Sequence, residues 1–84
     1  MDLEKAQVMF KLARKNNWGN KYDRLEHFKR FANLDKIVKE LENKGWLIKR
    51  KKPNYTGISL NSKYKEEIRE FIIKQIPYVK DMLK

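Results

Sequence analysis

The sequence predicts a mainly α-helical protein with a small β-hairpin, an α+β fold with the element order α-α-α-β-β-α. Apolar residues recur at helical spacing in several segments of the 84-residue chain, which is the pattern of helices that bury one face. Around Trp46 the period shortens to that of a strand, and a Pro-Asn turn leads into a second short strand. No linker rich in Gly, Pro or Ser divides the chain, so we expect residues 1–84 to form a single domain.

The first two helices are predicted over residues 2–15 and 23–32. Asp2 can cap the first helix, and the Asn and Gly residues that follow it tolerate the positive φ that ends helices. In the second helix, Asp23 and Glu26 have the spacing of a capping box. The apolar residues that we expect these helices to bury are Leu3, Ala6, Met9, Phe10, Leu12, Ala13, Leu25, Phe28 and Phe31, with Ala32 as an alternative to Phe31.

A third helix is predicted over residues 34–44 and a β-hairpin over residues 46–60. The helix turns Leu34, Ile37, Val38 and Leu41 inward. It ends before Gly45, a residue that readily adopts the left-handed conformation found after helices. The hairpin turns at Pro53 and Asn54, and its return strand alternates apolar and polar residues.

The C-terminal segment contains more apolar residues than one small core needs. A helix capped by Asn61 or Ser62 is predicted over residues 62–76, and Pro77 should end or kink it, leaving an apolar tail over residues 77–84. We expect a second copy of the chain to cover part of this surface, giving a homodimer; the alternative is that the segment folds back on the first helix of its own chain. The expected dimerisation residues are Ile72, Ile76, Val79, Met82 and Leu83.

The net charge of +10, from 21 Lys and Arg against 11 Asp and Glu, favours a polyanionic partner such as nucleic acid, an anionic membrane or an acidic protein. The excess of Lys over Arg is also typical of proteins from heat-loving organisms. The absence of Cys excludes disulfides and thiolate metal sites and is consistent with a cytoplasmic, intracellular protein, nucleoid-associated if prokaryotic. No apolar run is long enough to span a membrane, so we expect no membrane partner.

The most specific pattern runs from Leu34 to Arg50. A helix ends in a leucine and is followed by a polar triplet, Gly45, an apolar pair and a basic strand, and residues 58–63 then supply a return strand and a helix cap. Over about residues 22–71 the chain resembles the winged-helix (winged helix-turn-helix) DNA-binding family, and most closely transcription regulators of the MarR and ArsR kind. The resemblance implies a recognition helix over residues 34–44, a wing over 46–60, and a dimer that binds double-stranded DNA without a cofactor.

On the recognition helix, Lys36, Lys39, Glu40 and Asn43 share the face opposite the apolar stripe. Lysine can donate to guanine O6 and N7, and asparagine can pair with adenine N6 and N7, so Lys36, Lys39 and Asn43 are candidates for contact with the major groove. The alternative is an ordinary solvated face. The chain departs from the family in the acids on this helix, Asp35, Glu40 and Glu42, which disfavour an approach to phosphates.

The wing contains an uninterrupted run of cations, which we expect to contact the DNA backbone or the minor groove. The alternative is a hairpin whose lysines only protect a sheet edge from aggregation. Arg50 is the best candidate for the minor groove because its guanidinium is weakly hydrated. The nucleic-acid-binding residues expected on the wing are Lys49, Arg50, Lys51, Lys52, Asn54 and Tyr55.

Other side chains point to neither catalysis nor metal binding. Trp18 and Trp46 are interpreted as core residues rather than stacking platforms, and His27, the one histidine, as a surface or boundary residue without a partner for a metal. No phosphate-binding loop or placed nucleophile is present, so we expect no enzyme and no metal site. Two other functions remain open: a winged helix that docks in a protein assembly, and an RNA-binding protein.

Overall fold

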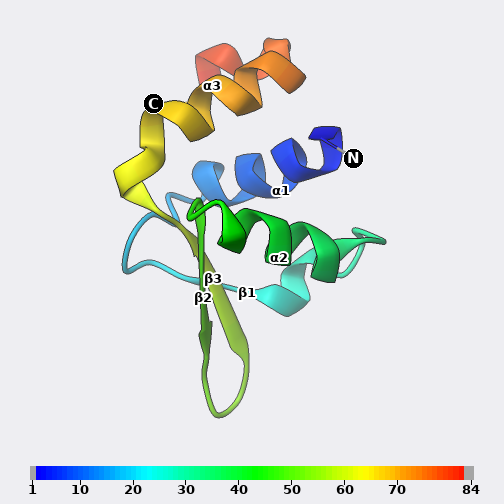
Figure 1. Ribbon diagram of the computed structural model, residues 1–84, viewed down its shortest axis with the longest axis vertical. Helices are drawn as coiled ribbons and strands as arrows, with labels where there is room; N and C mark the ends of the chain where they lie inside the picture. Colours follow the sequence, from blue (N-terminus) through cyan, green and yellow to red (C-terminus); the bar gives the residue numbers. More distant parts are fainter. Residues whose placement is uncertain (1, 83–84) are drawn as a thin grey trace.

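The computed structural model describes residues 2–82, which form a small α+β domain with a three-stranded antiparallel sheet. The helices are α1 (Asp2–Arg14), α2 (Leu34–Asn43) and α3 (Lys65–Gln75), and the strands are β1 (Asp23–Arg24), β2 (Leu47–Lys51) and β3 (Thr56–Leu60). In Figure 1, α1 lies between α3 and α2, and a long hairpin projects away from the helices. Three short 3-10 helices complete this part of the chain: η1 (Leu25–Phe28), η2 (Ser62–Tyr64) and η3 (Pro77–Met82).

The sheet has the strand order β1-β3-β2, with β3 at its centre. Strands β2 and β3 form the predicted hairpin, and their register pairs Leu47 with Leu60 at its base. Near its tip, the Lys52 N–H donates to the Tyr55 carbonyl over 2.7 Å. The hairpin predicted over residues 46–60 is therefore confirmed to within one residue at its start.

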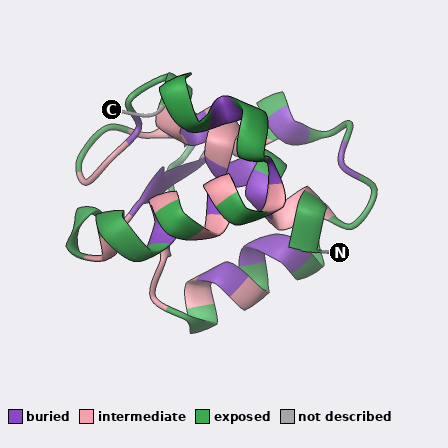
Figure 2. Ribbon diagram, turned by 90° about the horizontal axis from the view of Figure 1, so that it is seen from above, coloured by how far each residue is buried: buried purple, intermediate pink, exposed green. Residues whose placement is uncertain are grey.

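One hydrophobic cluster joins the helices to the base of the hairpin. Figure 2 shows the buried residues of the helices facing the interior of the molecule. Ile58 and Leu60 of β3 are fully buried under the helices, and α1 contacts both α2 and α3. The buried hydrophobic residues are Ala6, Val8, Met9, Leu12, Phe28, Phe31, Ile37, Val38, Leu41, Leu47, Ile58, Leu60, Ile68, Ile72, Ile76 and Val79. The core thus holds the base of the hairpin and leaves its far end in solvent.

Two helices end at residues in the left-handed region, as the sequence predicted. After α2, Gly45 has a φ of +80°; its N–H donates to the Glu42 carbonyl, and the next N–H, of Trp46, donates to the Leu41 carbonyl. After α1, Asn16 has a φ of +59°. These hydrogen bonds satisfy carbonyls that the helix itself leaves without a partner, and they turn the chain directly from α2 into β2.

The helix predicted over residues 23–32 is wrong. Asp23–Arg24 forms β1, which pairs with β3, and only Leu25–Phe28 is helical, as a single 3-10 turn. Phe28 and Phe31 are nevertheless buried, as expected. Pairing with β3, a strand that lies far along the chain, overrides the local preference for a helix.

The expected capping box does not form, because the Asp23 carboxylate has other partners. It accepts hydrogen bonds from the Arg24 N–H over 2.8 Å and from Lys15 Nζ over 3.1 Å, and it lies 2.7 Å from His27 Nδ1. Burial alone would raise the pKa of this carboxyl, but the hydrogen bonds from His27, Lys15 and Arg24 hold the pKa of Asp23 below its ordinary value. The Asp23 side chain of β1 therefore contacts both Lys15, the residue that follows α1, and His27 of η1.

The buried face of α1 is also rotated from the predicted one. Val8 is fully buried, whereas Leu3 is 48% exposed. The helix ends at Arg14, one residue earlier than predicted. At the other end of the chain, Asn61 caps η2, as expected, by accepting a hydrogen bond from the Lys63 N–H over 3.1 Å. The fourth predicted helix, over residues 62–76, consists of η2 followed by α3.

Most of the expected dimerisation residues lie in the chain's own core. Ile72, Ile76 and Val79 are buried, and α3 contacts α1, as in the alternative that the segment folds back on the first helix. Met82 is 55% exposed, and Leu83 lies outside the described residues. The burial of these three side chains needs no second copy, and the homodimer stays a prediction.

The two tryptophans are half-buried against the core, in agreement with their interpretation as core residues. The Trp46 ring lies edge-on to Phe71 of α3, with 5.6 Å between the ring centroids. Trp18 forms an isolated bridge with Leu60 beside the sheet. The Trp46 ring therefore joins α3 to the base of the hairpin, and the backbone of Trp18 pairs with that of Leu60 at the same place.

Candidate nucleic-acid interface

The outer face of α2 presents the three residues that the sequence singled out. Because Ile37, Val38 and Leu41 are buried, the opposite side of the helix is exposed, and Lys36, Lys39 and Asn43 all lie there. Within residues 2–82, no hydrogen bond or ion pair engages the side chains of Lys39 and Asn43. Their donors and acceptors are therefore available to a ligand.

Two of the three acids on α2 are held by cations from neighbouring elements. Glu40 forms a hydrogen-bonded ion pair with Lys5 of α1. The hydrogen bond lowers the pKa of Glu40 and raises that of Lys5. Glu42 lies 3.7 Å from Lys49 Nζ of β2. Glu40 thus turns toward α1 rather than toward the outer face. Asp35, in the first turn of α2, remains exposed.

The run of cations on the hairpin divides between the two faces of the sheet. The register sets Lys49 opposite Ile58, which faces the core, and Arg50 opposite Gly57. Side chains alternate along a strand, so Lys51 shares the face of Lys49, on the side of α2. All the cations of the run are exposed. These cations can contact one polyanion together only if the polyanion wraps around the hairpin or if the tip of the hairpin inserts into a groove of the polyanion.

A groove of about 600 Å³ separates α2 from β2 and brings three predicted residues together. Lys39 and Asn43 line it from the helix, and Lys49 lines it from the strand. The same groove also contains Asp35 and Glu42, so its charge is mixed. Helix and hairpin therefore present one continuous surface with hydrogen-bond donors on both sides.

Two residues at the tip of the hairpin line a hollow together with the start of α2. Asn54 and Tyr55 line this hollow, of about 350 Å³, together with Leu34 and Asp35. The Tyr55 ring is half-buried and lies 4.6 Å from the Arg24 guanidinium. Of the two tip residues, only Asn54 is exposed, so Tyr55 is less accessible than the sequence suggested.

The outer face of the sheet contains two functional candidates that the sequence reasoning missed, Tyr22 and Arg24. Arg50 Nε donates to the Tyr22 hydroxyl over 3.2 Å, and Lys52 Nζ lies 6.0 Å from the centre of the Tyr22 ring. Gly57 makes room for this ring, since a Cβ at Gly57 would lie 3.1 Å from Tyr22 Cβ. A strand prediction at residues 22–24 would have revealed both residues, because alternation sets them on the face of Arg50.

The part of the chain that the structure describes contains no group of three or more His, Cys, Asp or Glu side chains that could hold a metal ion. No helix within residues 2–82 has the length and apolar character needed to cross a membrane. Comparison of the chain with known protein families, with curated proteins and with solved structures finds no match.

Proposed function

We propose that the chain is a winged-helix protein that binds double-stranded DNA, with α2 in the major groove and the β2–β3 hairpin on the backbone or in the minor groove. The observation that carries the proposal is the surface shared by α2 and β2. Lys39 and Asn43 border one side of the groove and Lys49 the other. Base-reading donors on a helix beside phosphate-binding cations on a hairpin match the two kinds of contact that a duplex needs.

The arrangement of elements supports the same proposal. The chain runs from a helix through a short strand, a 3-10 turn and an amphipathic helix into a hairpin, and the first strand pairs with the last. In winged helices the second helix of such a unit enters the major groove. The outer face of α2 is exposed, and the opposite side of the helix is buried in the core.

The acids on α2 oppose DNA binding less than the sequence suggested. The Glu40 carboxylate is paired with Lys5 of α1. The 3.7 Å contact between Glu42 and Lys49 joins partly exposed groups, so it contributes little to stability and can exchange for a phosphate contact. The remaining acid, Asp35, lines the groove together with Lys39 and Lys49.

The test is the salt dependence of duplex binding, measured by fluorescence anisotropy with a labelled duplex of about 20 base pairs. The logarithm of the affinity falls linearly with the logarithm of the salt concentration, with a slope of about −0.9 for each neutralised phosphate. Replacing Lys49 and Arg50 together by alanine should flatten this slope by about two units.

A matched control replaces two cations that lie on neither α2 nor the hairpin, Lys21 and Lys74. Both side chains are exposed. Because two cations are removed in each case, the double alanine variant has the same net charge as the hairpin variant. It should keep the slope of the original protein. An RNA duplex of equal length serves as competitor. No measurable duplex binding at low salt, or a stronger preference for the RNA duplex, would contradict the proposal.

Transcription regulation and the homodimer are extensions of this proposal. A symmetric dimer would separate two α2 helices by about one turn of DNA and read a palindrome. Selection from random duplexes would reveal such symmetry in the preferred site. Light scattering on the free protein would report the mass of one chain if the dimer does not form.

A further inference from the structure

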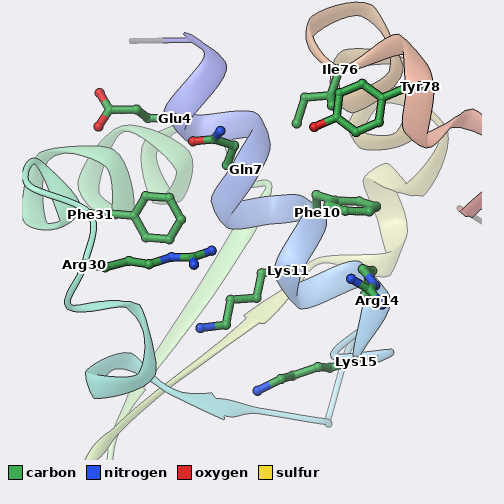
Figure 3. A pocket seen from close by; sticks show the side chains of 10 residues that line it. All are labelled: Glu4, Gln7, Phe10, Lys11, Arg14, Lys15, Arg30, Phe31, Ile76 and Tyr78. Atoms are coloured by element: carbon green, nitrogen blue, oxygen red, sulfur yellow. The ribbon is translucent and has the colours of Figure 1, made fainter.

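A separate groove of about 850 Å³ runs along the exposed face of α1 (Figure 3). It is bordered on one side by Arg30 and Phe31, which precede α2, and on the other by Tyr78 of η3. It is lined by different residues from the groove between α2 and β2. The residues that define its chemistry are Phe10, Lys11, Arg14, Lys15, Arg30 and Tyr78.

The charge in this groove is strongly positive, with Glu4 as the one acid among its lining residues. Lys15 is partly neutralised by Asp23, 3.1 Å away. Arg14 and Arg30 are exposed, and neither has a carboxylate partner among the residues that the structure describes. The groove therefore keeps cations that an acidic ligand could pair with.

The cations crowd one another at one end of the groove. Lys11 Nζ donates to the His27 carbonyl and lies 4.5 Å from the centre of the Phe28 ring. Desolvation lowers the pKa of Lys11, and the nearby charges of Lys15 and Arg30 lower it further. An anion bound at this point would relieve that repulsion.

The same groove offers apolar surface beside its charges. The Arg14 guanidinium lies 5.8 Å from the centre of the Phe10 ring, and Arg30 lies 5.0 Å from that of Phe31. The Tyr78 ring, on η3, is 82% exposed. Figure 3 shows Phe10 and Tyr78 on the same side of the groove. A ligand that fits must place carboxylates and apolar side chains within a few ångströms of each other.

We propose that this groove binds an acidic, amphipathic segment of a partner protein. A nucleic-acid backbone supplies the negative charge but no aliphatic groups to cover Phe10 and Tyr78. A second copy of the chain supplies apolar residues, but its net charge of +10 would bring like charges together across the contact. An amphipathic helix or strand rich in Glu and Asp satisfies both requirements, with apolar anchors on one side and carboxylates at the edges.

The probe is a labelled synthetic peptide of about 15 residues with Leu and Phe at helical spacing and Glu between them. Fluorescence anisotropy with the whole chain should report saturable binding. A second peptide, in which Ser replaces each Leu and Phe, keeps the charge and should bind at least tenfold more weakly. Equal affinity for the two peptides would overturn the proposal, because it would leave charge as the sole attraction.

Charge reversal locates the site. Arg14→Glu together with Arg30→Glu should weaken binding of the amphipathic peptide by tenfold or more, since both cations border the groove. The matched control, Lys21→Glu with Lys74→Glu, makes the same change in net charge at exposed residues outside the groove and should weaken binding less than threefold. Circular dichroism and the Tm establish that both variants are folded. Equal losses in the two variants would overturn the assignment of the groove.

Competition separates the peptide site from the proposed DNA surface. An unlabelled duplex added at equal concentration should leave the peptide bound, whereas the unlabelled amphipathic peptide should displace it. Displacement of the amphipathic peptide by the duplex would identify the groove as a nucleic-acid site and overturn the proposal. Because the peptide titration contains no DNA, its result is independent of the proposed function.

Discussion

Two surfaces of the chain gather cations, and they differ in what surrounds the charges. On the β2–β3 hairpin, Lys49, Arg50 and Lys51 are exposed, and the one ion pair that they form within residues 2–82 joins Lys49 to Glu42 over 3.7 Å. Along α1, Arg14 and Arg30 lie over aromatic rings at the borders of a groove.

The difference separates two kinds of recognition. Cations on a projecting ridge can follow a charged polymer over several phosphates, and their contribution falls with salt. Cations beside rings in a concave surface favour a ligand that also has apolar groups to bury, and part of that contribution persists in salt. The net charge of the whole chain does not make this distinction; the neighbours of each cation do.

The largest expected effect comes from the core that supports both surfaces. Leu60 is fully buried at the base of the hairpin, so Leu60→Ala should lower the free energy of unfolding by about 2–5 kcal/mol. Urea denaturation followed by tryptophan fluorescence would measure it. The matched control is Met82→Ala, at an exposed residue, with a change within about 0.5 kcal/mol. A loss below about 1 kcal/mol for Leu60→Ala would contradict a shared core.

Asp23 connects the two surfaces, because it lies on β1, which pairs with β3 of the hairpin, and it binds Lys15, which lines the groove of α1. Asp23→Asn should destabilise the protein by about 1–3 kcal/mol at neutral pH, through loss of charge-assisted hydrogen bonds to a buried group. The pKa of Asp23 is held below its ordinary value of 3.8. Its contribution is therefore complete above about pH 4 and is lost as the pH falls through the depressed pKa.

The measurement is urea unfolding at about pH 6 and about pH 3 for the original protein and the Asp23→Asn variant. The variant should lose less stability between the two pH values. Glu67→Gln, at an exposed residue of α3, should leave the difference unchanged. A pH dependence that is identical in the original protein and in Asp23→Asn would show that this carboxylate does not join the surfaces.

The preference for particular DNA sequences is expected to depend on the outer face of α2. Lys39→Ala with Asn43→Ala should reduce the discrimination between a selected duplex and a random one by about 1–3 kcal/mol for each lost bidentate contact. The matched control on α1, Gln7→Ala with Arg14→Ala, also removes one amide and one cation from an exposed helix face. It should leave discrimination intact. If both variants lose it equally, base reading does not reside on α2.

The smallest effect is expected at Tyr22, which positions Arg50 on the hairpin through a 3.2 Å hydrogen bond. Tyr22→Phe removes the acceptor and should weaken duplex binding by about 0.5–1.5 kcal/mol. Tyr78→Phe removes a hydroxyl from an 82% exposed residue of η3 and should have no effect on the duplex. Anisotropy titrations at one salt concentration would compare them; equal effects would argue against a positioning role for Tyr22.

The elements that follow from local patterns were predictable from the sequence. The apolar spacing of Ile37, Val38 and Leu41 and the glycine at residue 45 predict α2 and its end, and both are confirmed. The hairpin follows from the change of period and the Pro-Asn turn. These signals are contained in short stretches of chain, so no knowledge of distant neighbours is needed.

The errors arose where distant contacts decide the structure. The residues of β1 have a helix-start pattern, but pairing with β3 makes them a strand, and this concealed Tyr22 and Arg24. Likewise, the groove on α1 depends on Arg30 and Tyr78 reaching the same helix from opposite sides. Sequence periodicity reports which face of an element is apolar; it does not report what lies beside that face.

Duplex DNA is proposed to bind to α2 and the hairpin and to leave the groove of α1 free. An NMR titration of the isotope-labelled protein with a duplex of about 16 base pairs tests both parts at once, because each backbone amide reports separately. We expect shifts concentrated in residues 36–56 and little change around Phe10, Arg14 and Tyr78. Shifts centred on α1 and η3, or no shifts at low salt, would contradict the proposal.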